Sequence, residues 1–138
     1  MTLGAVLARH PGAVAFRFGD GAELCAELTA LALSGAKTAT CGALRDFDPE
    51  ARPEVGRRDV ACLWDWTPAA VIETTEVTER RFRDVPEDFA LAEGEGTFAD
   101  WRAGHVRFYE RNGGWDEGMW LLCERFRLVE ALRPLGAA

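Results

Sequence analysis

Residues 34–44, SGAKTATCGAL, join two segments with different hydrophobic periods. The segment before them carries leucines at i, i+4 and i+7, which predict one buried helix face: Leu24, Leu28 and Leu31. Gly35 is predicted to end that helix, because glycine adopts the left-handed C-terminal conformation without strain. Residues 38–44 are predicted to form a strand, in which Gly42 marks a bulge or a close approach. Lys37 therefore lies in a helix-to-strand turn, where a side chain is held in position and remains reachable.

Lys37 is the only lysine in a chain that has fifteen arginines. Since arginine occupies the other cationic positions, the remaining lysine is predicted to do something that arginine cannot. A buried or crowded lysine can lose its proton, whereas arginine stays charged. Thr38 and Thr40 follow closely, so a candidate base lies beside a candidate nucleophile. The structural alternative is a single cation at the C-terminal end of a helix.

The rest of the chain mixes short strands with helices. Strands are predicted at 16–18, 59–66, 69–78 and 119–132, and helices at 86–93 and 97–112. Capping-box spacing occurs twice, at Asp20 with Glu23 and at Thr97 with Asp100. Segregated helices and strands indicate an α+β fold, and a small closed or half-closed β-barrel would leave few unpaired strand edges.

The length of 138 residues fits one domain with its own core. We expect this domain at 16–132, with a loosely ordered N-terminal segment at 1–15 and a C-terminal tail at 133–138. No apolar run approaches the length of a membrane span, and we expect no signal peptide and no membrane partner. The four cysteines are widely spaced, which indicates reduced thiols in a cytoplasmic protein: Cys25, Cys41, Cys62 and Cys123.

The net charge of −7 argues against tight, non-specific binding to long nucleic acids, because that affinity comes largely from neutralising phosphates. We therefore expect no DNA partner, while a local pocket for one nucleotide stays compatible with this charge. Ser34 is the only serine, and no nucleophile elbow surrounds it. His10 and His105 are the only histidines, so a multi-histidine metal site is excluded. No phosphate loop or dinucleotide motif is present, and we expect neither a metal nor a cofactor.

Several segments, taken in order, resemble the ASCH domain, a branch of the PUA-like superfamily. The resemblance covers about residues 16–130. Its segments are Phe18-Gly19-Asp20, Glu23 to Leu31, Gly35-x-Lys37-Thr38-Ala39-Thr40, Val55-Gly56, Ile72 to Val77, Glu93-Gly94-Glu95-Gly96, Trp101 with His105, and Glu124-Arg125-Phe126. The resemblance implies a small PUA-like β-barrel ringed by a few helices, with a cleft that admits a nucleoside or short single-stranded RNA.

One bacterial subgroup of this family consists of N4-acetylcytidine amidohydrolases, whose working residues fall on Lys37, Thr40 and Glu93. The resemblance implies Thr40 as nucleophile, Lys37 as base, and Glu93 as the group that orients water or protonates the leaving amine. That subgroup carries an arginine where this chain has Gly42, so the resemblance does not determine which substrate this chain uses. The alternatives are a non-catalytic RNA- or nucleotide-binding module and a metal-independent ribonuclease.

Aromatic side chains that could stack on a cytosine ring are Trp64, Trp66 and Trp101, although tryptophans more often belong to the core. Further candidate substrate contacts are Thr38, Glu95 and His105. Glu95 is an alternative to Glu93 as the working carboxylate, and His105 has packing as its alternative role.

The strand pattern also gives expectations for two further residues, Cys41 and Glu124. Alternation puts Cys41 on the strand face opposite Thr40, so we predict a structural role for its thiol. Glu124 interrupts an apolar strand face and needs a partner such as an arginine.

Overall fold

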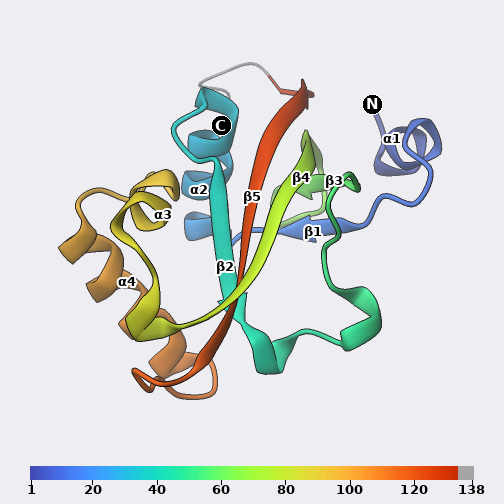
Figure 1. The fold of residues 1–138 in the computed structure, drawn as a ribbon. Coiled ribbons are helices and arrows are strands. Elements are labelled where there is room, and N and C mark those ends of the chain that lie inside the picture. Colours follow the sequence, from blue (N-terminus) through green and yellow to red (C-terminus); the bar gives the residue numbers. More distant parts are fainter. Residues whose placement is uncertain (134–138) are drawn as a thin grey trace.

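The computed structural model describes residues 1–133 as a mixed α/β domain (Figure 1). The strands are β1 (Ala15–Arg17), β2 (Ala39–Ala43), β3 (Arg58–Cys62), β4 (Pro68–Arg81) and β5 (Trp120–Ala131). The helices are α1 (Leu3–Arg9), α2 (Ala22–Ser34), α3 (Glu87–Ala92) and α4 (Phe98–Arg111). Short 3-10 turns occur at Leu44–Asp46, Pro49–Ala51 and Phe82–Asp84. None of the helices in the described residues is long and apolar enough to cross a membrane.

The five strands form one sheet with the order β1-β3-β4-β5-β2. β1 runs parallel to β3, and the other neighbours are antiparallel. The long pair β4 and β5 forms the centre, and its register shifts at Val71/Ile72 and Thr74/Glu76 bend both strands. Figure 1 shows α3 and α4 on the β2 side of the sheet and α1 at the β1 and β3 side.

The mixed α and β content agrees with the predicted class, but the sheet of residues 1–133 is not closed into the expected barrel. β1 and β2 are its two edges, and no pairing joins them. Both edge strands are short: β1 has three residues and β2 has five, whereas β4 and β5 have 14 and 12. The free edge of β2 instead meets the end of α3, where Thr38 N–H donates to the Ala92 carbonyl at 2.7 Å.

The N-terminal segment is more ordered than the loose attachment expected for residues 1–15. It contains α1, capped by the Thr2 side chain, and α1 buries Val6 completely against Val60, Cys62 and Val71 of β3 and β4. The predicted C-terminal tail at 133–138 lies, apart from Arg133, outside the described residues.

Of three helix-end predictions, two are confirmed and one is wrong. Thr97 and Asp100 form the predicted capping box of α4, and Gly35 ends α2 with φ of 85°. Asp20 does not cap α2, because its carboxylate accepts hydrogen bonds from Arg111 at 2.6 Å and from Asn112 at 2.8 Å. These two bonds tie the entrance of α2 to the end of α4, and both helices border the candidate site.

Candidate functional site

Lys37 and Glu93 form a buried ion pair. Lys37 Nζ donates to Glu93 Oε1 at 3.3 Å, and the two side chains are 1% and 2% exposed. Lys37 follows α2, and its backbone N–H donates to the Leu31 carbonyl of that helix. Glu93 is the C-terminal cap of α3. Two of the three predicted catalytic side chains therefore meet, although 56 positions separate them in the sequence.

Gly94 explains how the two backbones come so close. Its φ is +80°, and a Cβ at this position would lie 2.7 Å from the Ala36 carbonyl oxygen. The adjacent hydrogen bond from Thr38 N–H to the Ala92 carbonyl joins the same two segments. The glycine after Glu93 thus allows the loop to reach the Lys37 turn, because a side chain there would push the two segments apart.

Glu93 accepts hydrogen bonds on both carboxylate oxygens. Oε2 receives Trp101 Nε1–H at 2.6 Å and the Cys41 thiol at 3.2 Å, and His105 Nε2 lies 3.4 Å away. Burial opposes ionisation of this carboxyl, but the Lys37 ammonium and the bonds from His105 and Trp101 lower its pKa to about 2. Glu93 is therefore a carboxylate at neutral pH, held by four side chains.

His105 is oriented from its other nitrogen. Nδ1 lies 2.8 Å from the Trp101 carbonyl oxygen, which can only accept, so Nδ1 carries a proton. The imidazole also stacks on the Trp101 indole with centroids 4.4 Å apart. Burial disfavours the imidazolium, yet the Cys41 sulfur and the Glu93 carboxylate raise the pKa of His105 to about 11. Glu95 Oε2 lies 3.8 Å from Nε2, and burial raises the pKa of this second carboxyl.

Cys41 belongs to this cluster, contrary to the structural role predicted for it. Its thiol donates to Glu93 and lies 3.4 Å from the Tyr109 hydroxyl. Burial and the Glu93 charge raise the pKa of the thiol to about 12, so it is protonated at neutral pH. Thr40 and Cys41 both line this cavity, so their predicted separation onto opposite faces of the strand does not keep the Cys41 thiol away from it. No feature of the sequence alone indicates Tyr109.

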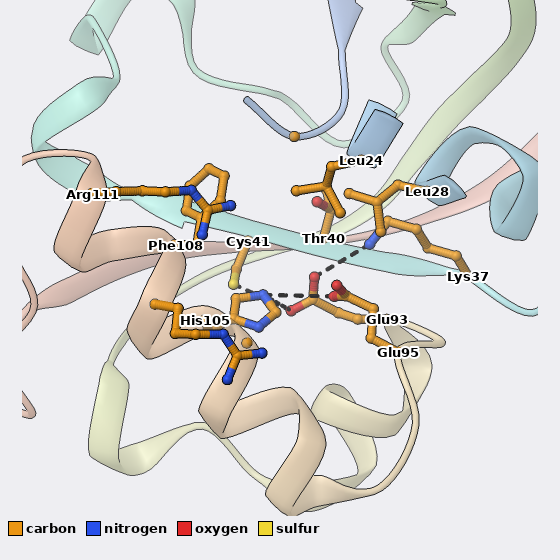
Figure 2. A pocket seen from close by; sticks show the side chains of 13 residues that line it. Leu24, Leu28, Lys37, Thr40, Cys41, Glu93, Glu95, His105, Phe108 and Arg111 are labelled. Carbon is orange, nitrogen blue, oxygen red and sulfur yellow. Dashed lines mark hydrogen bonds and ion pairs between the residues drawn. The ribbon is translucent and has the colours of Figure 1, made fainter. Parts of the chain in front are cut away.

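The cluster opens into a cavity of about 230 Å³, here called the polar cavity (Figure 2). Its polar lining comprises Lys37, Thr40, Cys41, Glu93, Glu95 and His105, with Arg107 and Arg111 also contributing. Thr40, the third predicted catalytic residue, thus shares the cavity with Lys37 and Glu93. No hydrogen bond joins the Thr40 hydroxyl to either side chain among the described residues.

A second cavity of about 430 Å³, the aromatic cavity, adjoins the first. Four phenylalanines contribute to its lining: Phe16, Phe18, Phe47 and Phe108. Gly19, Thr40, Cys41 and Phe108 line both cavities. Because residues of β1 and β2 line the aromatic cavity, it lies between the two edges that the sheet leaves unpaired.

The aromatic cavity also contains charged side chains. Arg17 and Arg57 reach its lining, and Arg57 is paired with Asp59 at 2.9 Å. Glu124 accepts a 2.6 Å hydrogen bond from the Thr74 hydroxyl, so its partner is a threonine and not the expected arginine. Burial raises the pKa of Glu124 despite this bond.

Gly42 also lines the aromatic cavity, and a Cβ there would lie 2.9 Å from the Phe47 ring. Phe47 therefore occupies the space that a side chain at position 42 would enter.

Three predicted substrate contacts lie elsewhere. Trp64 and Trp66 stack on the Arg17 guanidinium, 3.8 and 4.2 Å from their ring centroids, and line neither cavity. The predicted strand to residue 66 ends at Cys62, and Trp66 has φ of 69° in the following turn, so strand alternation does not apply there. Thr38 is exposed and also lines neither cavity.

Trp101, the third predicted stacking platform, is 2% exposed and packs against Phe82 and His105. Its indole N–H donates to Glu93, and its ring stacks on Phe82 and His105, so no face is free to stack on a base. Phe108 is the aromatic ring that lines both cavities.

Comparison with known proteins identifies the family. A family model of the ASCH domain matches residues 14–130, and the chain belongs to this family. The crystal structure of an ASCH domain from Lactobacillus crispatus JV V101 has 29% sequence identity and a TM-score of 0.78, and the match covers 90% of this chain and 84% of that one. Protein EF3133 from Enterococcus faecalis V583 has 28% identity and a TM-score of 0.80, with 98% and 94% covered. No curated protein matches the chain.

Proposed function

We propose that this protein hydrolyses an amide on a small nucleoside-like substrate, with N4-acylated cytidine as the first candidate. The observation that carries the proposal is the burial of the only lysine against Glu93, at the wall of a cavity that Thr40 also lines. A site that only had to bind phosphate would accept arginine, which the chain uses at fifteen other positions. The chemistry of a proton-transferring lysine explains why this position differs.

The proposed first step is acylation of Thr40. Lys37 Nζ first gives one of its protons to Glu93 Oε1, 3.3 Å away, and the resulting amine accepts the Thr40 hydroxyl proton as the Thr40 oxygen attacks the acyl carbon. This relay needs contact between Thr40 and Lys37, which we expect to form with substrate, because catalytic hydrogen bonds are often long without it.

The leaving amine needs a proton, and the one held by Glu93 is reserved for restoring the Thr40 hydroxyl through Lys37. We assign this role to His105, whose raised pKa keeps the imidazolium available at neutral pH. Water then attacks the acyl-threonine and returns a proton to His105, while Thr40 recovers its own through Lys37. The expected role of Glu93 thus narrows to accepting and returning a proton.

The two cavities support a substrate of nucleoside size. The polar cavity offers about 230 Å³ beside the reacting groups, and Phe108 provides an aromatic ring where it joins the aromatic cavity. The net charge of −7 also favours a small substrate over a long polyanion.

The test is turnover of a panel of N4-acylcytidines, followed by release of cytidine and the free acid. Thr40→Val should lower kcat/KM by about 100-fold or more, because it removes the nucleophilic oxygen and little volume. Thr38→Val is the matched control: the same change two positions away, on an exposed side chain, should leave turnover unchanged. Absence of turnover across the panel with the wild-type protein would contradict the proposal.

A non-catalytic nucleotide- or RNA-binding role is the second candidate, and the aromatic cavity favours it. Its four phenylalanines and two arginines are suited to stacking and phosphate contact. This candidate predicts that short single-stranded RNA binds with an affinity that survives Lys37→Ala. Turnover of an acylcytidine that Lys37→Ala abolishes would instead exclude a purely binding role.

A further inference from the structure

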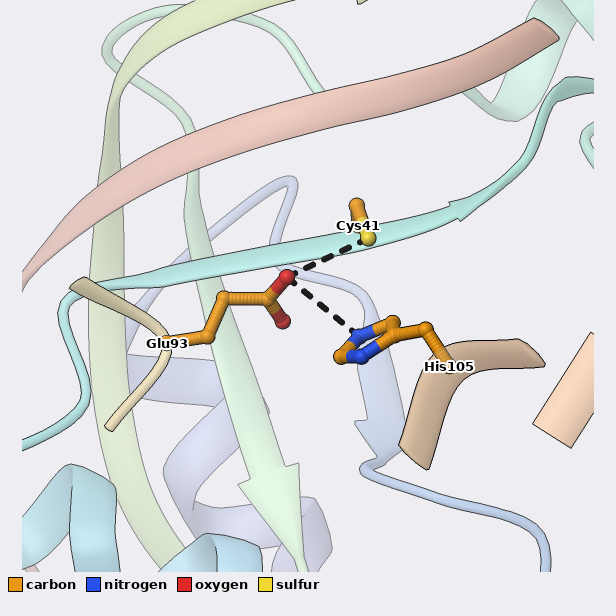
Figure 3. A group of neighbouring side chains, drawn as sticks. All are labelled: Cys41, Glu93 and His105. Atoms are coloured by element: carbon orange, nitrogen blue, oxygen red, sulfur yellow. Dashed lines mark hydrogen bonds and ion pairs between the residues drawn. The ribbon is translucent and has the colours of Figure 1, made fainter. Parts of the chain in front are cut away.

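Three potential metal ligands from separate parts of the chain converge on the polar cavity (Figure 3). They are the thiol of Cys41 on β2, the carboxylate of Glu93 after α3, and the imidazole of His105 on α4. Their ligand atoms all lie within 4.8 Å of one another. Sequence reasoning excluded a multi-histidine site, but a mixed sulfur, oxygen and nitrogen set needs only one histidine.

Two of the three distances between the ligand atoms are those of a tetrahedral ion, and the third, from Cys41 Sγ to His105 Nε2, is within 4.8 Å. Bond lengths of about 2.0–2.3 Å to sulfur, nitrogen and oxygen put neighbouring tetrahedral ligands about 3.3–3.6 Å apart. Here Cys41 Sγ lies 3.2 Å and His105 Nε2 lies 3.4 Å from the same oxygen, Glu93 Oε2. An ion could therefore contact all three with small side-chain adjustments.

The surrounding contacts are those that metal ligands commonly have. A ligating histidine usually donates its other ring N–H to a carbonyl, as His105 Nδ1 does to Trp101. A ligating carboxylate is usually hydrogen-bonded in turn, and Glu93 accepts from Trp101 and Lys37. The three side chains also line the polar cavity, which leaves a fourth position for water or for Glu95, whose Oε2 is 3.8 Å from Nε2.

We propose that Cys41, Glu93 and His105 form a binding site for a divalent transition-metal ion of the zinc class. One thiolate, one imidazole and one carboxylate suit Zn²⁺ or Co²⁺ and not Mg²⁺ or Ca²⁺, which prefer all-oxygen ligands. A divalent ion would displace one proton from the Cys41 thiol and one from the His105 imidazolium. The net charge of the three side chains together with what they bind is then unchanged.

The metal site and the proposed hydrolase both use Glu93 and His105, so a bound ion and the hydrolase reaction exclude each other. With His105 coordinated through Nε2, its imidazole has no proton for a leaving amine. Direct measurement of metal binding therefore tests this inference whether or not the acylcytidine assay succeeds.

The experiment is titration of the reduced, chelator-treated full chain with Co²⁺, a spectroscopic substitute for Zn²⁺. We expect saturation at one equivalent, with a thiolate-to-cobalt charge-transfer band and the visible bands of a tetrahedral ion. Zn²⁺ should displace Co²⁺, and Zn²⁺ but not Mg²⁺ should raise the melting temperature. No stoichiometric Co²⁺ binding by the wild-type protein would overturn the proposal.

Variants identify the ligands. Cys41→Ser should abolish the charge-transfer band, and His105→Gln should weaken Co²⁺ binding at least about tenfold. Cys25→Ser is the control, since Cys25 is a buried residue of α2 that donates its thiol to the Cys62 carbonyl and does not line the polar cavity. A charge-transfer band that persists in Cys41→Ser would overturn the proposal, because the thiolate would then belong to another cysteine.

Discussion

The polar and aromatic cavities share a wall but hold their carboxylates in opposite ways. In the polar cavity, Glu93 has a cation and three other side chains around it, and its pKa is lowered to about 2. In the aromatic cavity, Glu124 has one hydrogen-bond partner among the side chains of the described residues, the Thr74 hydroxyl, and burial raises its pKa. The first arrangement stabilises the ionised carboxylate, whereas the second favours the neutral carboxyl.

Removing the charge from each carboxylate gives the largest predicted difference. Glu93→Gln leaves the buried Lys37 ammonium without its counter-ion and should lower the free energy of unfolding by about 3–5 kcal/mol. Glu124→Gln can keep the Thr74 hydrogen bond and should change it by less than about 1 kcal/mol. Urea denaturation at neutral pH measures both. Similar decreases in the free energy of unfolding of the two variants would contradict the proposed difference between the two carboxylates.

The pH dependence of the free energy of unfolding below neutral pH should also differ between Glu93 and Glu124. The folded-state pKa of Glu93 is below its ordinary value of 4.5, so the unfolded state binds more protons and stability falls as pH drops from 4.5 toward 2. The folded-state pKa of Glu124 is raised, so its ionisation costs stability as pH rises above 4.5. Urea denaturation at a series of pH values from 2 to 7 measures this. The decrease in the free energy of unfolding at low pH should be smaller in Glu93→Gln than in the wild type, and unchanged in Glu124→Gln.

A backbone change tests how the polar cavity is assembled. Gly94→Ala should destabilise the protein by about 1–3 kcal/mol more than Gly12→Ala, since both glycines have positive φ but only the first would contact another segment, at Ala36. It should also lower turnover by moving Glu93 relative to Lys37. Equal destabilisation would mean that the close approach has no energetic consequence.

The smallest effect is expected in the aromatic cavity. Gly42→Ala puts a methyl group 2.9 Å from the Phe47 ring and should displace it, which alters substrate fit. We expect KM for an acylcytidine to change by about tenfold with kcat nearly constant. Steady-state kinetics distinguish this from a loss of kcat, which would mean that Gly42 acts on the reacting groups.

The sequence could predict features that depend on local pattern or on ordered motifs. The end of α2 at Gly35 and the cap of α4 follow from local rules and are confirmed. The meeting of Lys37 with Glu93 came from the family resemblance, because no periodicity connects residues 56 positions apart.

Other features depend on tertiary contacts that a single sequence does not contain. Asp20 left its predicted helix cap for Arg111, and the turn after Cys62 moved Trp64 and Trp66 onto Arg17. The expected barrel is not closed: β1 and β2 stay unpaired edges of the sheet, and residues of both line the aromatic cavity.

The most direct test of the central claim is hydrolysis of N4-acetylcytidine by the wild-type protein and by Lys37→Arg. The account predicts turnover by the wild type and a loss of about 100- to 10,000-fold in Lys37→Arg, because arginine keeps the charge but cannot pass a proton. Circular dichroism and the melting temperature establish that the variant is folded. Equal turnover by a folded Lys37→Arg would contradict the account, since Lys37 would then transfer no proton in the reaction.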